Sequence, residues 1–274
     1  MSELKLFTDP RIELVGRPSM DVNGVLAFLD EHELEWPEFR AKLDHISNKL
    51  EGRDAEWLIE QAGRGCYMSF GGKGRNHEDH VKHLIEVMHG SVLEHVNFNF
   101  HVWGISRSCS HEIVRHRAGF AYSQLSQRYV DSSDCAFVVP PAIQELKDAN
   151  PNLYEMWLRS CEKSQQLYEL LTSKLAEMYK DIESKTERRK KARQAARSVL
   201  PNATETKMLI TCNGRAARHF CEMRAHPAAD LEIRKLAIQM FDLLHKNFPL
   251  ITHGMEVVTL EDGTEGIESK FRKV

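Results

Sequence analysis

The residues best suited to chemistry are concentrated between Arg115 and Tyr129, in the sequence RHRAGFAYSQLSQRY. This segment holds three arginines and one histidine, several neutral hydrogen-bonding side chains and no acid. A buried guanidinium group needs an anionic partner, so we do not expect the segment to pack as core. Arginine presents a planar fork of donors that matches phosphate and carboxylate oxygens. The composition therefore indicates an anion-binding surface, with a solvated basic loop as the alternative.

The whole chain has the composition of a soluble globular protein. It has 274 residues, of which 42% are hydrophobic and 28% are charged. Its net charge of −3 argues against nucleic acid as a partner. No apolar run is as long as a membrane span, and the N-terminus lacks the apolar core of a signal peptide. We therefore expect a cytoplasmic protein that binds neither nucleic acid nor membrane.

The cysteines do not indicate a metal site. The chain has six, and none forms a C-x-x-C pair. In a cytosolic protein they are expected to be reduced and mostly buried, without thiolate-bound zinc. His77, His80 and His83 recur every third residue, which permits a metal site, but a polar helix face is the favoured interpretation. We therefore predict no metal.

Two predicted elements position the cationic segment. Residues 96–103 alternate apolar and polar side chains and predict a strand with one buried face. A helix should then begin at Ser106 or Ser108 and run to His116, with Arg107, His111 and Arg115 on one side. It should break at Ala118–Gly119, and residues 119–129 should form a loop. Further along the chain, Asn213 is placed to cap a helix that ends near Arg224.

Other patterns complete the fold. Strands are predicted at residues 10–16 and 137–139, helices after the caps Asp21, Asn76 and Asp230, and a hairpin around Asp262–Gly263. A long helix at 152–182 should bury a stripe of Leu153, Met156, Trp157, Leu167, Leu171, Leu175 and Met178. Residues 63–72 are rich in glycine and should let the backbone approach a ligand or act as a flexible connector. The fold class is α+β, a small antiparallel sheet with several packed helices. We expect a single domain over residues 1–274, with residues 1–60 as a peripheral N-terminal extension.

The segment from Arg115 to Tyr129 resembles the signature of the flavin-dependent thymidylate synthases: Arg-His-Arg, seven residues, Ser, and Arg-Tyr soon after. Three further blocks are similar to the family, at residues 89–95, 195–206 and 213–225, and residues 63–67 fit a fourth. One departure is that eight residues, Ala118 to Leu125, separate Arg117 from Ser126. This extra residue lengthens the segment near Ala118–Ala121.

The resemblance implies reductive methylation of dUMP to dTMP. Methylenetetrahydrofolate would give the carbon, reduced FAD the hydride, and NADPH would reduce the flavin. By resemblance Arg224 is the catalytic residue, since a fixed cation beside the pyrimidine favours ionisation of the ring imide. The alternative is an arginine that complements the C-terminal dipole of its helix. Ser126 as a nucleophile ranks below Ser126 as a binding residue, because the sequence places no base for it.

The binding residues also come from the resemblance. Arg128 and Arg197 would hold dUMP, with further contacts from Glu112, Arg115, Gln124, Leu125, Ser126, Gln127 and Arg224. FAD would contact Ser91, Arg115, His116, Arg117, Gln124, Asn213, Gly214, Arg215 and His219. The family works as a homotetramer whose active sites lie between subunits, so the segment after Arg117 and the helix with Arg224 would come from different chains.

Three alternatives to this function stay open. The extra residue motivates a related methylase that acts on another uridine nucleotide. A non-catalytic flavin- or nucleotide-binding protein would use the same arginines without turnover. A nucleic-acid binder fits the arginine-rich loops but not the net charge.

Overall fold

The computed structural model describes residues 4–43, 53–71, 74–272 and 274. Its centre is an antiparallel sheet of four strands in the order β2-β3-β6-β4. These strands are β2 (Arg11–Gly16), β3 (Asn97–Ser106), β6 (Glu205–Asn213) and β4 (Phe120–Gln124). The predicted α+β class with a small antiparallel sheet is confirmed.

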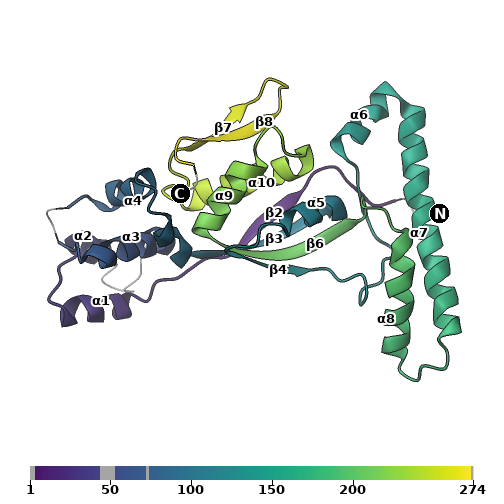
Figure 1. The fold of residues 1–274 in the computed structure, drawn as a ribbon, viewed down its shortest axis with the longest axis horizontal. Coiled ribbons are helices and arrows are strands. Elements are labelled where there is room, and N and C mark those ends of the chain that lie inside the picture. Colours follow the sequence, from purple (N-terminus) through teal and green to yellow (C-terminus); the bar gives the residue numbers. More distant parts are fainter. Residues whose placement is uncertain (1–3, 44–52, 72–73, 273) are drawn as a thin grey trace.

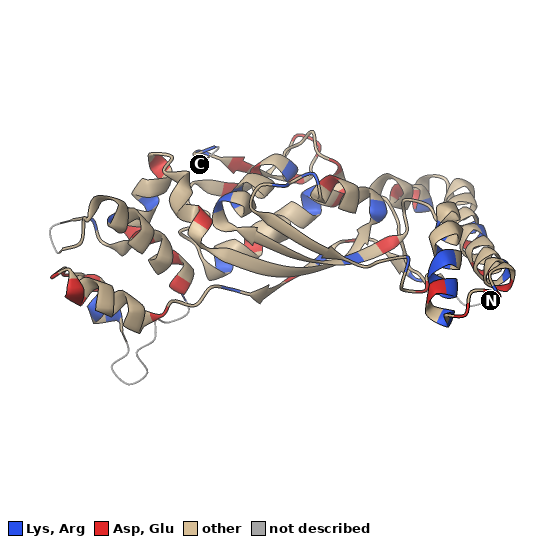
Figure 2. Ribbon diagram, turned by 60° about the horizontal axis from the view of Figure 1, so that its bottom comes forward, with Lys and Arg blue, Asp and Glu red and all other residues tan. Residues whose placement is uncertain are grey.

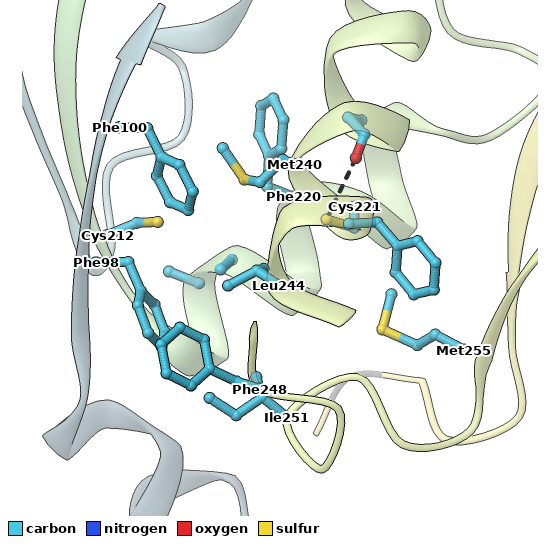
Figure 3. Packing of buried hydrophobic residues seen from close by; sticks show 14 of the residues in the cluster. Phe98, Phe100, Cys212, Phe220, Cys221, Met240, Leu244, Phe248, Ile251 and Met255 are labelled. Atoms are coloured by element: carbon cyan, nitrogen blue, oxygen red, sulfur yellow. Dashed lines mark hydrogen bonds between the residues drawn. The ribbon is translucent and has the colours of Figure 1, made fainter. Parts of the chain in front are cut away.

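One face of this sheet carries the core. Along β3, Phe98, Phe100 and Val102 are buried while Asn97 and His101 are exposed, as the alternation predicted. The helices α5 (Arg107–Ile113), α9 (Gly214–Arg224) and α10 (Leu231–Asn247) lie on the same side of the sheet (Figure 1). Figure 3 shows phenylalanines of β3 facing side chains of α9 and α10 such as Phe220 and Met240. The packing of this face fixes where α5 and α9 present their polar side chains.

Helices occupy both ends of the molecule (Figure 1). At one end lie α1 (Val22–Glu31), α2 (Pro37–Lys42), α3 (Asp54–Tyr67), α4 (His77–Glu86) and the 3-10 helix η1 (Gly90–His95). At the other end lie α6 (Pro141–Ala149), α7 (Pro151–Met178), α8 (Lys185–Ala196) and the 3-10 turn η2 (Arg197–Val199). Short strands β1 (Leu6–Phe7) and β5 (Phe137–Val138) pair in parallel, and β7 (Met255–Thr259) and β8 (Glu265–Ser269) form the predicted hairpin. No helix in the described ranges is both long and apolar enough to cross a membrane.

Several helix starts were predicted correctly because their caps are local. The side chains of Asp21, Asn76, Ser106 and Asn213 each accept a hydrogen bond from a backbone N–H in the first turn of the helix that follows. Asp230 precedes α10 but makes no such bond. The cysteines are unpaired, and four of the six are buried. Those predictions on the cysteines are confirmed.

The glycine-rich segment at 63–72 is a connector only in part. Residues 63–67 belong to α3, residues 68–71 follow it outside any helix or strand, and Gly72 lies outside the described residues. The predicted approach of this backbone to a ligand stays a prediction. A Cβ on Gly63 would lie 2.6 Å from a methyl carbon of Leu84. Gly63 is therefore needed where α3 packs closely against α4.

The histidines of α4 do not form an exposed polar face. His77 is 9% exposed, its Nδ1 lies 2.5 Å from Glu60 Oε2, and its ring stacks on Trp57 with centroids 3.8 Å apart. Arg64 Nε donates to the other carboxylate oxygen of Glu60 at 2.6 Å. Burial lowers the pKa of His80 to about 4. These groups form a buried polar network that joins α3 to α4.

The long helix exists, but its apolar stripe is not part of the core. Leu153, Met156, Leu167 and Met178 are 45%, 65%, 44% and 69% exposed. The reason is topological: α7 packs on α6, α8 and η2 at the edge of the molecule and not on the sheet. Periodicity correctly predicted the helix, yet within one chain much of its apolar side is left uncovered.

Candidate active site

Arg224, the predicted catalytic residue, is held on two sides by groups from α5 and the turn after it. Its Nη1 donates to Glu112 Oε2 at 2.9 Å and its Nη2 to the Glu112 carbonyl at 3.2 Å. Its Nε donates to His116 Nε2 at 2.8 Å. Charged donors of this kind form the stronger class of hydrogen bond. The guanidinium is thus fixed in orientation at the last residue of α9.

The bond from Arg224 requires a neutral His116. Nε2 can accept from Arg224 only when it carries no proton, so the proton of the neutral ring must lie on Nδ1. Burial lowers the pKa of His116 to about 4, and the nearby charges of Arg224 and His219 act in the same direction. His116 therefore serves as a hydrogen-bond acceptor across the neutral pH range.

Glu112 lies in an acidic environment that Arg224 only partly balances. Burial raises the pKa of Glu112, and the charge of Asp230 raises it further, while Arg224 lowers it. The Asp230 side chain, which makes no capping bond to α10, thus acts on Glu112.

A second cationic group lies at the other end of α5. Arg107, the first residue of that helix, has Nη1 3.5 Å from the Leu125 carbonyl and 3.4 Å from Thr206 Oγ1. Burial lowers the pKa of Arg107, and the neighbouring charge of Arg197 lowers it too. The two positive charges act on one another, and an anion bound between them would relieve this repulsion. Arginines in such an arrangement are suited to a phosphate.

The predicted substrate residues Gln124 and Leu125 lie beside this pair. Gln124 Nε2 donates to Ser110 Oγ at 3.0 Å and to Thr206 Oγ1 at 3.2 Å. The Leu125 N–H donates to the Lys207 carbonyl at 2.9 Å, so it is already used and is not a free donor for an anion. Gln124 ends a strand where a loop was predicted; β4 pairs with β6 from Phe120 to Gln124. That pairing gives the segment a fixed position.

Ser126 and Arg128 follow in a tight turn. The Ser126 carbonyl accepts from the N–H groups of Tyr129 and Val130, and its Oγ lies 3.4 Å from the Arg128 nitrogen. Gln127 is buried within the turn. Arg128 Nε is buried without a hydrogen-bond partner in the described part of the chain. Arg128 therefore retains hydrogen-bonding capacity in the turn that follows Leu125.

Helix α8 contacts the end of this turn through the side chains of Arg193 and Lys190. Arg193 Nη1 donates to the Tyr129 carbonyl at 2.6 Å, and its Nη2 pairs with Asp131 at 2.8 Å. Lys190 lies over the Tyr129 ring, 5.3 Å from its centroid. Figure 2 shows how strongly lysine and arginine are concentrated on this helix. The basic stretch at residues 185–191 was expected to be a solvated helix face; in the structure Lys190 of this stretch, and Arg193 after it, contact the segment that ends at Asp131.

The predicted flavin residues Asn213 and Gly214 form the start of α9. Asn213 Oδ1 accepts from the Ala216 N–H at 2.8 Å, and its own N–H donates to the Gly119 carbonyl at 3.0 Å. Gly119 has a φ of +72°, and a Cβ there would lie 2.7 Å from Asn213 Nδ2. The Phe120 N–H closes a turn onto the Arg117 carbonyl at 3.3 Å. This turn leads directly into β4, whose pairing with β6 begins at Phe120.

The predicted helix through His116 ends earlier, at Ile113. The Tyr122 hydroxyl lies 2.9 Å from the Ile113 carbonyl and 2.6 Å from the His116 carbonyl, where it can donate to either. Burial raises the pKa of this phenol, so it stays a donor. Tyr122 therefore caps the end of α5 and fixes the turn that carries Arg115, His116 and Arg117.

The remaining flavin candidates surround this turn. Arg215 pairs with Glu94 at 2.6 Å and donates from Nε to the Val274 carbonyl at 2.9 Å. His219 lies next to His116, with ring centroids 6.1 Å apart. Ser91 is exposed on η1, which packs against α9. The structure thus brings most of the predicted residues into two adjoining groups linked by α5.

Exposed arginines and a helix N-terminus together suit a dinucleotide. Arg115 and Arg117 are exposed, and no carboxylate of the described residues pairs with either. The turn after Arg117 contacts the N-terminus of α9 through the hydrogen bond from Asn213 to Gly119, and the helix dipole there favours phosphate. A Cβ at Gly119 would clash with Asn213 and one at Gly214 with the Leu93 carbonyl, so these glycines allow the turn and η1 to pack closely on the start of α9. This donor set fits the diphosphate of FAD.

The prediction of active sites shared between subunits stays a prediction. Within the single chain Arg224 contacts Glu112 and His116. Sequence reasoning missed Arg107, Ser110 and Thr206 as site residues. Arg107 was assigned to a helix face, and nothing in its local pattern indicated that Arg197 would lie beside it.

Comparisons with known proteins identify the family. The model of the thymidylate synthase complementing protein family matches residues 49–250. A flavin-dependent thymidylate synthase of Mycobacterium avium is 47% identical over 211 residues, which cover 76% of this chain and 82% of that protein. One of Mycobacterium marinum is 46% identical over 213 residues, covering 77% and 83%.

A solved structure has the same fold. It is a UMP/dUMP methylase, PolB, from Streptomyces cacaoi bound with 5-Br dUMP, which aligns with a TM-score of 0.62 at 21% identity over 90% of this chain and 95% of that one. The family match covers the segments that carry Glu112, His116, Arg197 and Arg224. The chain therefore belongs to the thymidylate synthase complementing protein family.

Proposed function

We propose that the protein is a flavin-dependent thymidylate synthase that methylates dUMP at carbon 5 to give dTMP. The observation that carries the proposal is Arg224, fixed by Glu112 and a neutral His116. Its place at the end of α9 lies within the stretch matched by the family model. The relatives that are 46–47% identical bear this enzyme's name.

Substrate binding is assigned to the cationic group at the start of α5. Arg107 and Arg197 supply two guanidinium groups for the dianionic phosphate, and Arg128 supplies a third with an unsatisfied Nε. Gln124, already held by Ser110 and Thr206, supplies a neutral amide for the sugar or base. Ser126 belongs to the binding turn and not to nucleophilic catalysis, because no described base contacts its hydroxyl.

Arg224 acts on the pyrimidine ring. A fixed cation stabilises the negative charge that develops when the ring imide ionises, and this makes carbon 5 nucleophilic. His116 holds Nε and Glu112 holds the other two nitrogens, so the guanidinium needs no reorganisation during reaction. After the new carbon–carbon bond forms at carbon 5, the proton on that carbon must leave. Its release is therefore the measurable sign of the reaction.

The cofactor and co-substrates follow the family. FAD would be held by Ser91, Arg115, His116, Arg117, Gln124, Asn213, Gly214, Arg215 and His219. When bound, it supplies the redox chemistry that the side chains lack. Methylenetetrahydrofolate would give the carbon and NADPH the reducing equivalents. All these reactants are metabolites of the cytoplasm, where we place the enzyme.

A homotetramer is the proposed assembly. The exposed apolar residues of α7, including Met156 and Met178, leave a surface that a second copy would cover. Subunits would then share active sites, although the contacts of Arg224 with Glu112 and His116 are made within one chain. Light scattering or sedimentation of the purified protein tests this assembly.

A tritium-release assay tests the function. Purified protein is given dUMP labelled with tritium at carbon 5, together with FAD, NADPH and methylenetetrahydrofolate. We expect release from the wild type and loss of release in Arg224→Ala. A wild type that binds FAD and releases no tritium would contradict the synthase and leave a non-catalytic binding protein.

Another uridine nucleotide is the second candidate substrate. The one-residue-longer segment motivates it, and the structural neighbour is described as a UMP/dUMP methylase. Against it, the relatives that are 46–47% identical are thymidylate synthases by name, and Gln124 is held at the end of β4 by pairing with Met208. We therefore favour dUMP, and turnover of UMP equal to or better than dUMP in the same assay would reverse that order.

A further inference from the structure

The C-terminal part of the chain follows α9 closely, although it lies beyond residues 49–250 matched by the family model. We define the C-terminal strap as residues 251–272 together with Val274. It contains the β7–β8 hairpin and then returns towards η1. Its contacts with α9 fall on residues 215, 218, 222 and 225. These positions are three or four apart and therefore lie on one side of the helix.

Buried Arg218 is the main anchor of the strap. It is 2% exposed, and its Nη1 donates to the carbonyls of Ile251 at 2.6 Å and His253 at 3.1 Å. Its Nη2 donates to the Phe271 carbonyl at 3.2 Å. One guanidinium therefore joins the beginning and the end of the strap. Removing a buried charged donor of this kind leaves several carbonyls unsatisfied.

Two further contacts extend the attachment along α9. The Ile267 N–H donates to the Ala225 carbonyl at 3.1 Å, directly after Arg224. Ser269 Oγ donates to Glu222 Oε1 at 3.1 Å. The strap thus binds the helix from its middle to its C-terminus.

At its far end the strap reaches Arg215, a proposed flavin residue. Val274 is 6% exposed and belongs to the main hydrophobic cluster, and its carbonyl oxygen accepts from Arg215 Nε at 2.9 Å. Glu94 holds Nη1 of the same side chain at 2.6 Å. Within the described part of the chain Nη2 has no partner. The Arg215 guanidinium is therefore held through Nε and Nη1, and its Nη2 stays available for a ligand.

Gly90 shows that this junction is closely packed. A Cβ at Gly90 would lie 2.3 Å from the Val274 carbonyl carbon and 2.9 Å from Arg215 Nε. Glycine is thus required on η1, one residue before Ser91, for the strap to approach Arg215. Ser91 and Arg215 come from different elements, and Val274 lies at their junction.

We propose that the C-terminal strap positions Arg215 for the phosphates of a flavin dinucleotide, with Val274 as its positioning residue. The inference rests on the proposed function, because it assigns a role within the same flavin site. Holding Arg215 in place before binding reduces the conformational entropy lost on binding. Loss of the strap contact therefore weakens flavin affinity before it affects the chemistry.

The test is the affinity of the full-length protein for FAD, measured by the change in FAD fluorescence on titration. Val274→Asp puts a charge into an apolar site and should expel the end of the strap. We expect FAD to bind roughly tenfold more weakly, the size of effect for one hydrogen bond to a charged group. The conservative variant Val274→Ile keeps an apolar side chain at this position and should bind FAD with wild-type affinity. Val257→Asp makes the same change at a 37% exposed position of β7 and should leave affinity unchanged.

A double-mutant cycle with Arg215→Ala separates positioning from a general loss of structure. If Val274 acts through Arg215, Val274→Asp should weaken FAD binding little further in the Arg215→Ala protein. Equal effects in both backgrounds would show that the strap acts elsewhere and would overturn the proposal. If Val274→Asp fails to fold, Gly90→Ala tests the same contact from the η1 side, with the same expected loss of affinity.

The remaining outcomes are distinct. FAD binding that is unchanged or tighter in Val274→Asp overturns the positioning role, since tighter binding would mean that Val274 competes with the flavin. A wild-type chain that binds no FAD overturns the proposed function and the role of the strap with it. Normal FAD affinity together with absent tritium release overturns only the synthase reaction.

Discussion

His116 offers the sharpest test of the site, because its neutral state follows from one contact. Nε2 accepts from Arg224 at 2.8 Å, and burial lowers its pKa from 6.5 to about 4. Between these two values the unfolded chain binds a proton that the folded chain does not. Stability should therefore be lost as the pH falls from about 6.5 towards 4, and it should be fully present above about 6.5.

The size of the effect follows from linkage. At pH 5 the two pKa values of 6.5 and about 4 give a loss of about 2 kcal/mol relative to neutral pH. The ring is not fully buried, so solvent screening reduces this to about 1 kcal/mol. His116→Gln keeps an acceptor close to the position of Nε2 and removes the titration. Its stability should thus fall by about 1 kcal/mol less than that of the wild type between pH 7.5 and pH 5.

Urea unfolding at these two pH values, at one fixed protein concentration, measures the difference. Fixed concentration matters because an oligomer's stability depends on it. His111→Gln is the matched control, since His111 is exposed on α5, just before the turn that carries His116. We expect this control to follow the wild type. Equal losses of stability in wild type and His116→Gln would refute the assignment of His116 as a buried neutral acceptor.

Three further predictions test other contacts. Gly119→Ala should lower the free energy of unfolding by about 1–3 kcal/mol, because φ is +72° and a Cβ would lie 2.7 Å from the Asn213 amide. Gly263→Ala is the control, since Gly263 has a φ of +78° but open space around it. Thermal unfolding of the two variants should show the smaller loss of stability in the control. Arg107→Gln should raise KM for dUMP at least about tenfold with little change in kcat, since phosphate binding is uniform between ground and transition states; an unchanged KM would remove Arg107 from the site. Glu112→Gln should lower kcat roughly tenfold by loosening Arg224, and steady-state tritium release with a wild-type kcat would contradict that role.

The parts of the fold that depend on neighbouring residues were predictable from the sequence. Asn213 and Ser106 are caps whose partners lie three residues ahead, so local pattern was sufficient. The alternation from Phe98 to Val102 required only the two-residue period of a strand. By contrast, β4 was missed because its five residues, FAYSQ, are short and partly polar. Its strand conformation depends on pairing with β6, about ninety residues later.

The site itself shows the same limit. Family resemblance indicated Glu112, His116 and Arg224 separately, but not that one guanidinium would bind both of the others. Arg107 gave no local signal, because its neighbours Thr206 and Arg197 are distant in sequence. The stripe on α7 has the period of a buried helix, yet a period cannot tell whether the covering surface belongs to the same chain.

The arginines of the site divide into two classes by how they are paired. Arg224, Arg215 and Arg193 each have a carboxylate from another segment: Glu112, Glu94 and Asp131. Across the described residues, no acid pairs with Arg107, Arg128 or Arg197.

A carboxylate partner fixes the orientation of an arginine and offsets its positive charge. An arginine without such a partner keeps both its charge and its hydrogen-bond donors for a ligand. Arg107, Arg128 and Arg197 are assigned to the proposed substrate phosphate near the end of β4, and the likewise unpaired Arg115 and Arg117 are assigned to the flavin. The paired class fixes the two ends of α9 and the turn that α8 supports. An acid introduced beside the unpaired class, such as Ser110→Asp next to Gln124, should therefore abolish nucleotide binding while it leaves Arg224 in place.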